Sequence, residues 1–298
     1  MKRVFKALGV VVALAAIALG VFVWINASAY DASMAKLYDV PPMAITASKD
    51  PAVIARGEHL SKSLAGCSLH DCHGPDLGGG RTIEMGPVMT VVGPNITNVL
   101  PAYSDGELAR LVRHGLKKDG RSIVFMPVMD FDWLPDDDVT ALVSYLRTVP
   151  TSKKAGGATK VKLLGKILDR QNKMVIDVAR RIDHAHVEVA PPPSPTPAYG
   201  AFVARLCTGC HGEHLSGGRI PGAPKSMAVP LNLTPDPSGL AGWSYADFER
   251  MIQTSARKNG KPLDRLMPTE ALANMDDVER HALFAYLQSL PPTPFGNR

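Results

Sequence analysis

Residues 207–211 read Cys-Thr-Gly-Cys-His, and this short stretch decides how the rest of the chain is interpreted. Two thiols three positions apart could form a disulfide in an oxidising compartment or contribute to a zinc site. The C-x-x-C-H spacing, with the imidazole directly after the second thiol, is typical of covalent attachment of haem c. In such a site two thiols bond the two vinyl groups of one porphyrin, and the imidazole lies beneath the iron. We therefore expect Cys207 and Cys210 to attach a haem and His211 to bind its iron.

An earlier stretch resembles this one, with one departure from the pattern. The triplet Cys-His-Gly recurs at residues 72–74, but four residues rather than two separate Cys67 from Cys72. Both sulfurs can still reach one haem if the extra residues bulge outwards. We expect Cys67 and Cys72 to attach a second haem and His73 to bind its iron. His70, inside the bulge, is expected to face solvent rather than iron.

The similarity between the two stretches extends over most of the chain. The paired segments are Leu77-Gly78-Gly79 and Leu215-Ser216-Gly217, Asn95-Ile96-Thr97 and Asn232-Leu233-Thr234, Met126-Pro127 and Met267-Pro268, and the apolar runs at 141–146 and 282–287. Two copies of one domain explain this pattern. We expect an N-terminal repeat at residues 31–150 and a C-terminal repeat at residues 199–298. Residues 151–198 belong to neither copy, and their apolar part is expected to pack across the two repeats.

The local signals within each repeat favour helices. Asp50-Pro51 is a helix start, with an N-cap followed by proline at the first helical position. Ser104 and Glu107 form a capping box ahead of a second helix, and a later helix ends before Pro150. We find no convincing alternation of apolar and polar residues of the kind that predicts strands. The predicted fold class is all-α, with a transmembrane helix followed by two tandem domains.

Each haem iron needs a second axial ligand from the opposite wall of its pocket. Met126 and Met267 are the candidates, because they occupy equivalent positions, precede proline and lie just ahead of the last helix of each repeat. A thioether is a soft ligand, and ligation by methionine and histidine raises the reduction potential of haem. The alternative role of a methionine is core filling. Met85, Met89 and Met129 are the fallback ligands in the N-terminal repeat.

The N-terminus carries a targeting or membrane segment at residues 1–30. Lys2, Arg3 and Lys6 precede an uncharged run from Ala7 to Ile25, which would span roughly 28 Å as a helix. Positive charges on this side place the N-terminus in the cytoplasm and everything after the run on the periplasmic side. The length of the run favours an uncleaved anchor, although residues 27–29, Ala-Ser-Ala, also have the form of a signal-peptide cleavage site.

Composition excludes several other classes of protein. The chain has 298 residues, of which 45% are hydrophobic and 20% charged, as expected of folded domains. The net charge is only +5, and three of these charges lie in the first six residues. Without a basic run or a stripe of basic and aromatic residues, nucleic acid is not an expected partner.

On these motifs the chain resembles membrane-anchored dihaem cytochromes c, built from two class I cytochrome c domains. It is similar to the cytochrome c subunits of periplasmic alcohol and gluconate dehydrogenases, although these contain three such domains. The resemblance rests on Cys-His-Gly, Leu-x-Gly-Gly, Asn-x-Thr and Met-Pro, and it covers about 250 residues. It implies two covalently bound haems c, and redox partner proteins such as a membrane oxidoreductase, a dehydrogenase or a terminal oxidase.

The expected function is transfer of single electrons in a respiratory chain at the periplasmic face of a bacterial inner membrane. Two irons with histidine and methionine ligands leave no open site for a substrate, so we expect an electron carrier rather than an enzyme. The alternative is a dihaem enzyme of the cytochrome c peroxidase type. Such an enzyme needs one iron that can open a coordination position, whereas both repeats here retain Met-Pro.

Overall fold

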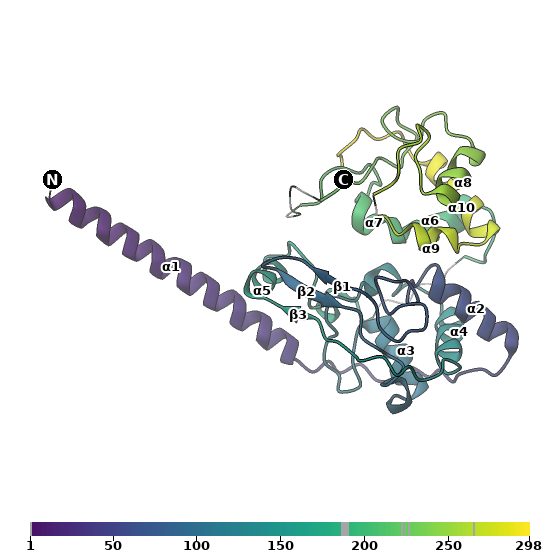
Figure 1. Cartoon of the computed structure of the whole chain (residues 1–298), viewed down its shortest axis with the longest axis horizontal. Coiled ribbons are helices and arrows are strands. Elements are labelled where there is room, and N and C mark those ends of the chain that lie inside the picture. Colours follow the sequence, from purple (N-terminus) through teal and green to yellow (C-terminus); the bar gives the residue numbers. More distant parts are fainter. Residues whose placement is uncertain (1, 186–190, 222, 224, 226, 265) are drawn as a thin grey trace.

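The computed structural model describes residues 2–185, 191–221, 223, 225, 227–264 and 266–298. The chain begins with a long helix, α1 (Lys2–Ala35), which projects from the rest of the molecule and meets it only near its C-terminal end (Figure 1). From Arg3 to Ala35 this helix is long and apolar enough to cross a membrane. It continues beyond the expected end at residue 30, and its last turns pack on the folded part of the chain.

The N-terminal repeat is mostly helical. Its elements are α2 (Pro51–Lys62), β1 (Thr82–Glu84), β2 (Met89–Val92), η1 (Leu100–Ala102), α3 (Asp105–His114), η2 (Val128–Asp130) and α4 (Asp136–Leu146). The predicted start signals act as expected: the Asp50 side chain accepts a hydrogen bond from the Ala52 N–H, and Ser104 and Glu107 form the capping box of α3. Gly115 ends α3 in the left-handed conformation that glycine favours.

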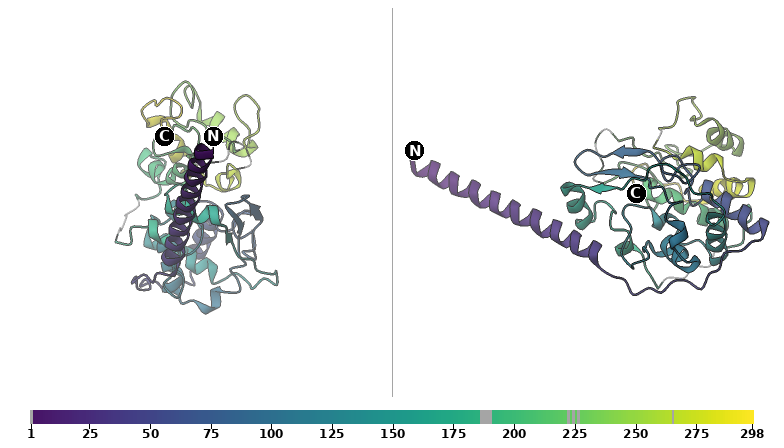
Figure 2. Two further views of the ribbon diagram at one scale, coloured as in Figure 1. Left: turned by 90° about the vertical axis from the view of Figure 1, so that its left-hand side faces the viewer. Right: turned by 60° about the horizontal axis from the view of Figure 1, so that its bottom comes forward.

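The C-terminal repeat has helices at corresponding places and, in α7 (Arg205–His211), one helix without a counterpart. Its other helices are α6 (Pro197–Val203), α8 (Tyr245–Thr254), α9 (Thr269–Ala273) and α10 (Asp277–Ser289). A capping box of Ser244 and Asp247 starts α8, as Ser104 and Glu107 start α3. This repeat lies against the N-terminal repeat, and Figure 2 shows the two from further sides. Buried side chains of both repeats join in one hydrophobic core.

Close backbone contacts recur at equivalent positions in the two repeats. Gly57 in α2 lies so close to α4 that a Cβ there would be 1.9 Å from the carbonyl oxygen of Ala141. Gly200 in α6 has the same relation to Ala282 in α10, also at 1.9 Å. In each repeat the first helix therefore crosses the last helix at a point where only glycine fits. The sequence repeat is thus matched by a repeated packing contact.

The expectation of an all-α fold is wrong in one detail, because the described residues include a small antiparallel sheet in the order β1-β2-β3. Strand β3 (Lys160–Val161) pairs with β2, bringing Val161 opposite Met89. The burial of β1 does not alternate, since all three of its residues are exposed. Its pairing therefore left no periodic signal in the sequence, and β3 comes from far along the chain.

Residues 151–198 contain β3, α5 (Leu163–Arg170) and η3 (Ala179–Arg181). These elements pack on the N-terminal repeat and on α1. The Phe125 N–H donates to the Ile176 carbonyl at 2.9 Å, and the Gln171 side chain donates to Asn26 of α1 at 2.7 Å. In addition, Val178 and Ile182 belong to the hydrophobic core that both repeats share. The segment secures the last turns of α1 to the N-terminal repeat.

Candidate haem sites

The second cysteine pair lies on a short helix with its histidine. Helix α7 carries Cys207, Cys210 and His211, which places all three side chains on two turns of one element. The imidazole is 5% exposed, and its Nδ1 lies 2.7 Å from the carbonyl oxygen of Leu231. Because a carbonyl can only accept, Nδ1 carries the proton and donates this bond. Nε2 is then left with its lone pair, the form of histidine that binds a metal.

The first cysteine pair lies on a series of turns rather than a helix. The His73 N–H donates to the Cys67 carbonyl at 3.1 Å, and the Cys72 N–H donates to the Leu69 carbonyl at 3.0 Å. These bonds bring His73 back to Cys67 despite the two extra residues. The Nδ1 of His73 donates to the Pro94 carbonyl at 3.0 Å, so this imidazole also keeps Nε2 free.

The polypeptide behind both histidines follows the same course. The Gly79 N–H donates to the His73 carbonyl at 2.8 Å, and the Gly217 N–H donates to the His211 carbonyl at 2.9 Å. The preceding Leu77 and Leu215 have positive φ angles of 54° and 55°, a conformation that is uncommon outside glycine. The two histidines are therefore held by the same strained turn in each repeat.

Burial keeps the expected site groups uncharged. It lowers the pKa of His73 and His211, while the hydrogen bonds to Pro94 and Leu231 oppose this effect. It also raises the pKa of the thiols, to about 12 for Cys67 and Cys207 and to about 11 for Cys72. Neutral imidazoles are ready to bind a metal.

The expected methionine ligands lie at equivalent places just before a short helical turn. Met126 precedes η2 and Met267 precedes α9, and both side chains are half-buried against the hydrophobic core. Of the fallback residues, Met89 belongs to a different cluster around Tyr30 of α1, and Met85 packs there too. Met129 packs against the same core as Met126. The contacts of the two sulfurs with the histidines across a haem stay a prediction.

The described residues fit haem c by the chemistry of their donors. All four cysteines are free, as attachment to vinyl groups requires, and each pair is followed by an imidazole with its Nε2 available. The glycines behind the first pair leave no room for side chains: a Cβ on Gly93 would lie 1.5 Å from the Cys72 carbonyl oxygen. The loop after His73 is thereby packed tightly against the attachment segment.

Sequence reasoning missed the contacts that connect the two sites. His70 is exposed, as expected, and its Nδ1 also lies 2.9 Å from Glu270, three residues after Met267. On the other side, Asp130 of η2 lies beside Gly209 of α7, where a Cβ would be 3.6 Å from its carboxylate. The Met-Pro loop of each repeat thus meets the cysteine segment of the other. These pairs are far apart in sequence, so no local pattern could have indicated them.

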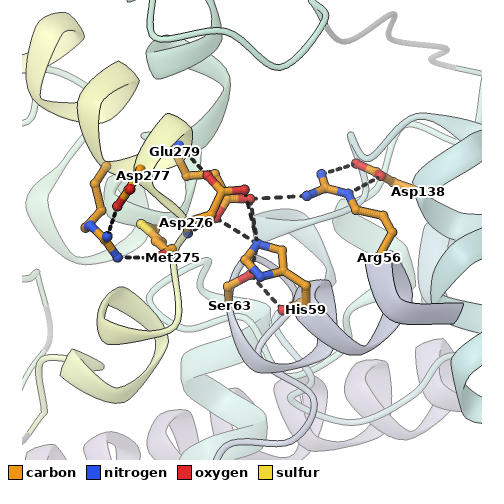
Figure 3. Close-up of polar contacts among 9 residues, drawn as sticks. Arg56, His59, Ser63, Asp138, Met275, Asp276, Asp277 and Glu279 are labelled. Atoms are coloured by element: carbon orange, nitrogen blue, oxygen red, sulfur yellow. Dashed lines mark hydrogen bonds and ion pairs between the residues drawn. The ribbon is translucent and has the colours of Figure 1, made fainter. Parts of the chain in front are cut away.

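A central cluster at the same interface was also missed. Glu279 of α10 is 1% exposed and is reached by Arg56 and His59 of α2 (Figure 3). His59 has no counterpart histidine in the second repeat, and its sequence context indicates only a surface or core role. In the sequence, Glu279 is a charged residue at the third position of a helix. A capping role explains a carboxylate there, so nothing local indicates its contact with α2.

Comparison with known proteins identifies one of the two repeats. Residues 198–291 match the family model described as Cytochrome c. The chain therefore contains a cytochrome c domain, and a cytochrome c domain implies haem c. This match coincides with the C-terminal repeat and includes Cys207, Cys210, His211 and Met267.

Several curated proteins are similar to parts of the chain. The cytochrome c subunit of alcohol dehydrogenase (quinone) of Gluconacetobacter polyoxogenes is 34% identical over 94 residues, which cover 29% of this chain and 20% of that protein. The gluconate 2-dehydrogenase cytochrome c subunit of Pantoea cypripedii is 31% identical over 107 residues, covering 33% and 24%. The fructose dehydrogenase cytochrome subunit of Gluconobacter japonicus is 25% identical over 265 residues, covering 80% and 52%.

The chain spans about half or less of the length of each of these relatives. It is a distant homologue of cytochrome c subunits of quinone dehydrogenases. A match over 80% of the chain is longer than either repeat, so the similarity to the fructose dehydrogenase subunit includes residues of both.

Proposed function

We propose that the protein is a membrane-anchored dihaem cytochrome c that carries single electrons as the cytochrome subunit of a periplasmic dehydrogenase. One haem is attached by Cys67 and Cys72 and the other by Cys207 and Cys210. His73 and Met126 would bind the iron of the first haem, and His211 and Met267 that of the second.

One observation carries the second haem. Each histidine donates from Nδ1 to a backbone carbonyl at an equivalent position of its repeat, at 3.0 Å from His73 to Pro94 and 2.7 Å from His211 to Leu231. This bond sets the tautomer and the orientation of an imidazole that binds iron. A histidine that served only as a surface side chain would have no need of it. The recurrence of the bond therefore supports haem in the N-terminal repeat as well.

The haem iron supplies the chemistry by accepting and releasing one electron. The chain would supply binding and tuning: the four thiols would hold the porphyrins, and the neutral imidazoles and the methionine sulfurs would bind the irons. Soft thioether ligation and burial both favour the reduced iron and raise its potential. With a histidine and a methionine holding each iron, no site would be open for a substrate, which favours a carrier over a peroxidase.

The contacts of α1 support retention of the N-terminal helix as an anchor. Tyr30 is 4% exposed, and Ser33 donates a hydrogen bond to Asp177 at 2.5 Å. Asn26, directly after the apolar run, accepts from Gln171. Cleavage after Ala29 would remove Asn26 and leave Tyr30 at a free terminus. The folded part of the chain thus uses residues on both sides of the cleavage sequence.

Counting haems in the intact protein tests the proposal. Pyridine haemochrome absorbance against protein mass should give two haems c per full-length chain. Replacing Cys67 and Cys72 by Ser should leave one haem, and so should replacing Cys207 and Cys210. One haem per chain in the unsubstituted protein, and no change in that count after loss of Cys67 and Cys72, would show that the N-terminal repeat carries none. Isolation in mild detergent should recover a dehydrogenase with the cytochrome, and reduction of both haems by its substrate would identify the donor.

A further inference from the structure

At the contact between the two repeats, Arg56 of α2 lies between the equivalent helices α4 and α10. Gly57 and Gly200 are equivalent, so Arg56 corresponds to Tyr199, and by the same register Asp138 of α4 corresponds to Glu279 of α10. Arg56 bonds both of these carboxylates: Nε lies 2.9 Å from Asp138 and Nη1 lies 3.3 Å from Glu279. One guanidinium therefore joins the last helix of its own repeat to the last helix of the other (Figure 3).

His59, one turn further along α2, reaches the same carboxylate. Its Nε2 lies 2.9 Å from both oxygens of Glu279. Glu279 is 1% exposed, whereas the side chains of Arg56 and His59 are 27% and 24% exposed. A carboxylate buried this deeply is costly unless cationic or hydrogen-bonding groups accompany it. Its side-chain partners, Arg56 and His59, both come from the other repeat, so they reach the carboxylate only when the repeats are docked.

The counterpart of His59 in the second repeat makes the reciprocal contact. Phe202 of α6 packs on Trp133 of the N-terminal repeat, with ring centroids 3.9 Å apart at an angle of 78°. The guanidinium of Arg205 also lies over the Trp133 ring, 5.8 Å from its centroid. Trp133 is 2% exposed and Phe202 is 4% exposed. Equivalent faces of α2 and α6 therefore contact the other repeat, α2 through charged groups and α6 through an aromatic ring.

The ligand atoms of His59, Asp276 and Glu279 lie within 4.8 Å of one another, which raises the alternative of a metal site. The surroundings oppose a cation. The guanidinium of Arg56 already occupies one oxygen of Glu279, and the other accepts the Asp276 N–H at 3.1 Å as part of the capping box of α10. A metal ion would have to displace a positive charge from its nearest carboxylate. The cluster has the composition of an ion pair rather than that of a metal site.

We infer that Arg56, His59 and Glu279 form an interdomain clasp that holds the two haem domains in one fixed arrangement for electron transfer between them. This inference rests on the proposed function, because it assigns the clasp to positioning two haems. The reciprocal contacts fit this role: His70 bonds Glu270 beside the second Met-Pro loop, and Asp130 lies beside α7. Each methionine loop is thereby held against the cysteine segment of the other repeat.

The test uses the full-length chain with its haems in detergent. His59→Ala removes one partner from the α2 side, and Glu279→Gln removes the charge while its amide oxygen can still cap α10. Glu58→Gln and Asp277→Asn are the matched controls, since these exposed carboxylates pair with Lys62 and Arg280 within their own helices. Hydrogen exchange of α2 and α10 reports docking, and circular dichroism of the Soret band reports the relative orientation of the haems.

Both clasp variants should raise exchange in α2 and α10 by about tenfold or more and reduce the coupled Soret signal. His59→Ala takes one side-chain partner from the buried Glu279 carboxylate, and Glu279→Gln removes the charge that Arg56 and His59 bind across the interface. The double variant should change no further than Glu279→Gln alone, because both substitutions break the same contact. Neither control should change either readout.

Unchanged exchange in both clasp variants would overturn the inference, as would equal changes in the controls. Calorimetric binding of Zn²⁺ that His59→Ala and Glu279→Gln abolish would overturn it in favour of a metal site. Failure of the proposed function is distinguished by the haem count. With a single haem per chain the Soret coupling would be absent even in the unsubstituted protein, while the exchange measurement would still report whether the clasp holds the repeats together.

Discussion

Alanine at Gly57 should destabilise the protein, although alanine is the better helix former. In an open helix this substitution would stabilise by up to about 1 kcal/mol. Here the new Cβ would lie 1.9 Å from the Ala141 carbonyl oxygen and 2.9 Å from the Tyr145 Cβ. An ordinary contact of about 3.4 Å would require α2 and α4 to separate by roughly 1.5 Å. Overpacking of this kind costs about 1–3 kcal/mol, and a backbone oxygen cannot rotate away.

The net loss in the free energy of unfolding should be about 2 kcal/mol, or roughly 4–8 °C in midpoint. Thermal unfolding of the full-length protein, followed by its haem absorbance, measures the midpoint. Gly200→Ala should have a similar effect, because its Cβ would lie at the same 1.9 Å from Ala282. Gly156→Ala is the control, since nothing lies within 4 Å of its added carbon. Gly57→Ala protein as stable as the parent would refute the reasoning that this crossing requires glycine.

Three further predictions concern the site. Met267→Ala should lower the reduction potential of one haem by a few tenths of a volt and let its reduced iron bind CO, because axial ligands set haem potentials over about 0.8 V. A redox titration measures the potential, with Met251→Leu as the control. An unchanged potential would show that Met267 is not a ligand. Cys67→Ala should shift the pyridine haemochrome band of one haem to that of a single thioether; an unshifted spectrum would mean that Cys67 is not attached. Burial, and then the charge of Asp132, raises the pKa of Asp130 to about 7. The folded pKa lies above the unfolded value of about 3.9, so the free energy of unfolding falls as pH rises from about 4 to 7, by at most about 1.4 kcal/mol for each pH interval of one. Asp130→Asn should therefore be more stable than the parent at pH 8 and equal to it at pH 4 in urea unfolding, and equal midpoints at both pH values would contradict the raised pKa.

The features that the sequence predicted well are those whose causes are local. The cap at Asp50 and the capping box of Ser104 and Glu107 each depend on residues within one turn of helix, and both are present. The cysteine and histidine motifs are equally local. The methionine candidates were predictable because Met126 and Met267 occupy equivalent positions in the two repeats.

The features that it did not predict depend on residues far apart in the chain. Strand β3 pairs with β2 across some 70 residues without any alternating pattern. Glu279 meets Arg56 across 223 positions, and its place at the start of α10 has a sufficient local explanation in capping. The docking of two similar domains depends on where they differ, as Arg56 differs from Tyr199. A sequence repeat identifies residues that the two domains share, so it does not indicate positions at which they differ.

The continuous course of α1 has a consequence for encounters with partners. The helix runs for 34 residues without a break, and its turns beyond Ile25 are bound to Lys166 of α5, to Gln171 and to Asp177. Under the proposed anchoring, these turns act as a strut of about 15 Å rather than a flexible tether. The molecule then keeps one height and one tilt above the bilayer, which removes most of its rotational freedom before any collision. Partners embedded in the same membrane would meet a single face, and their binding surfaces must lie at the matching height.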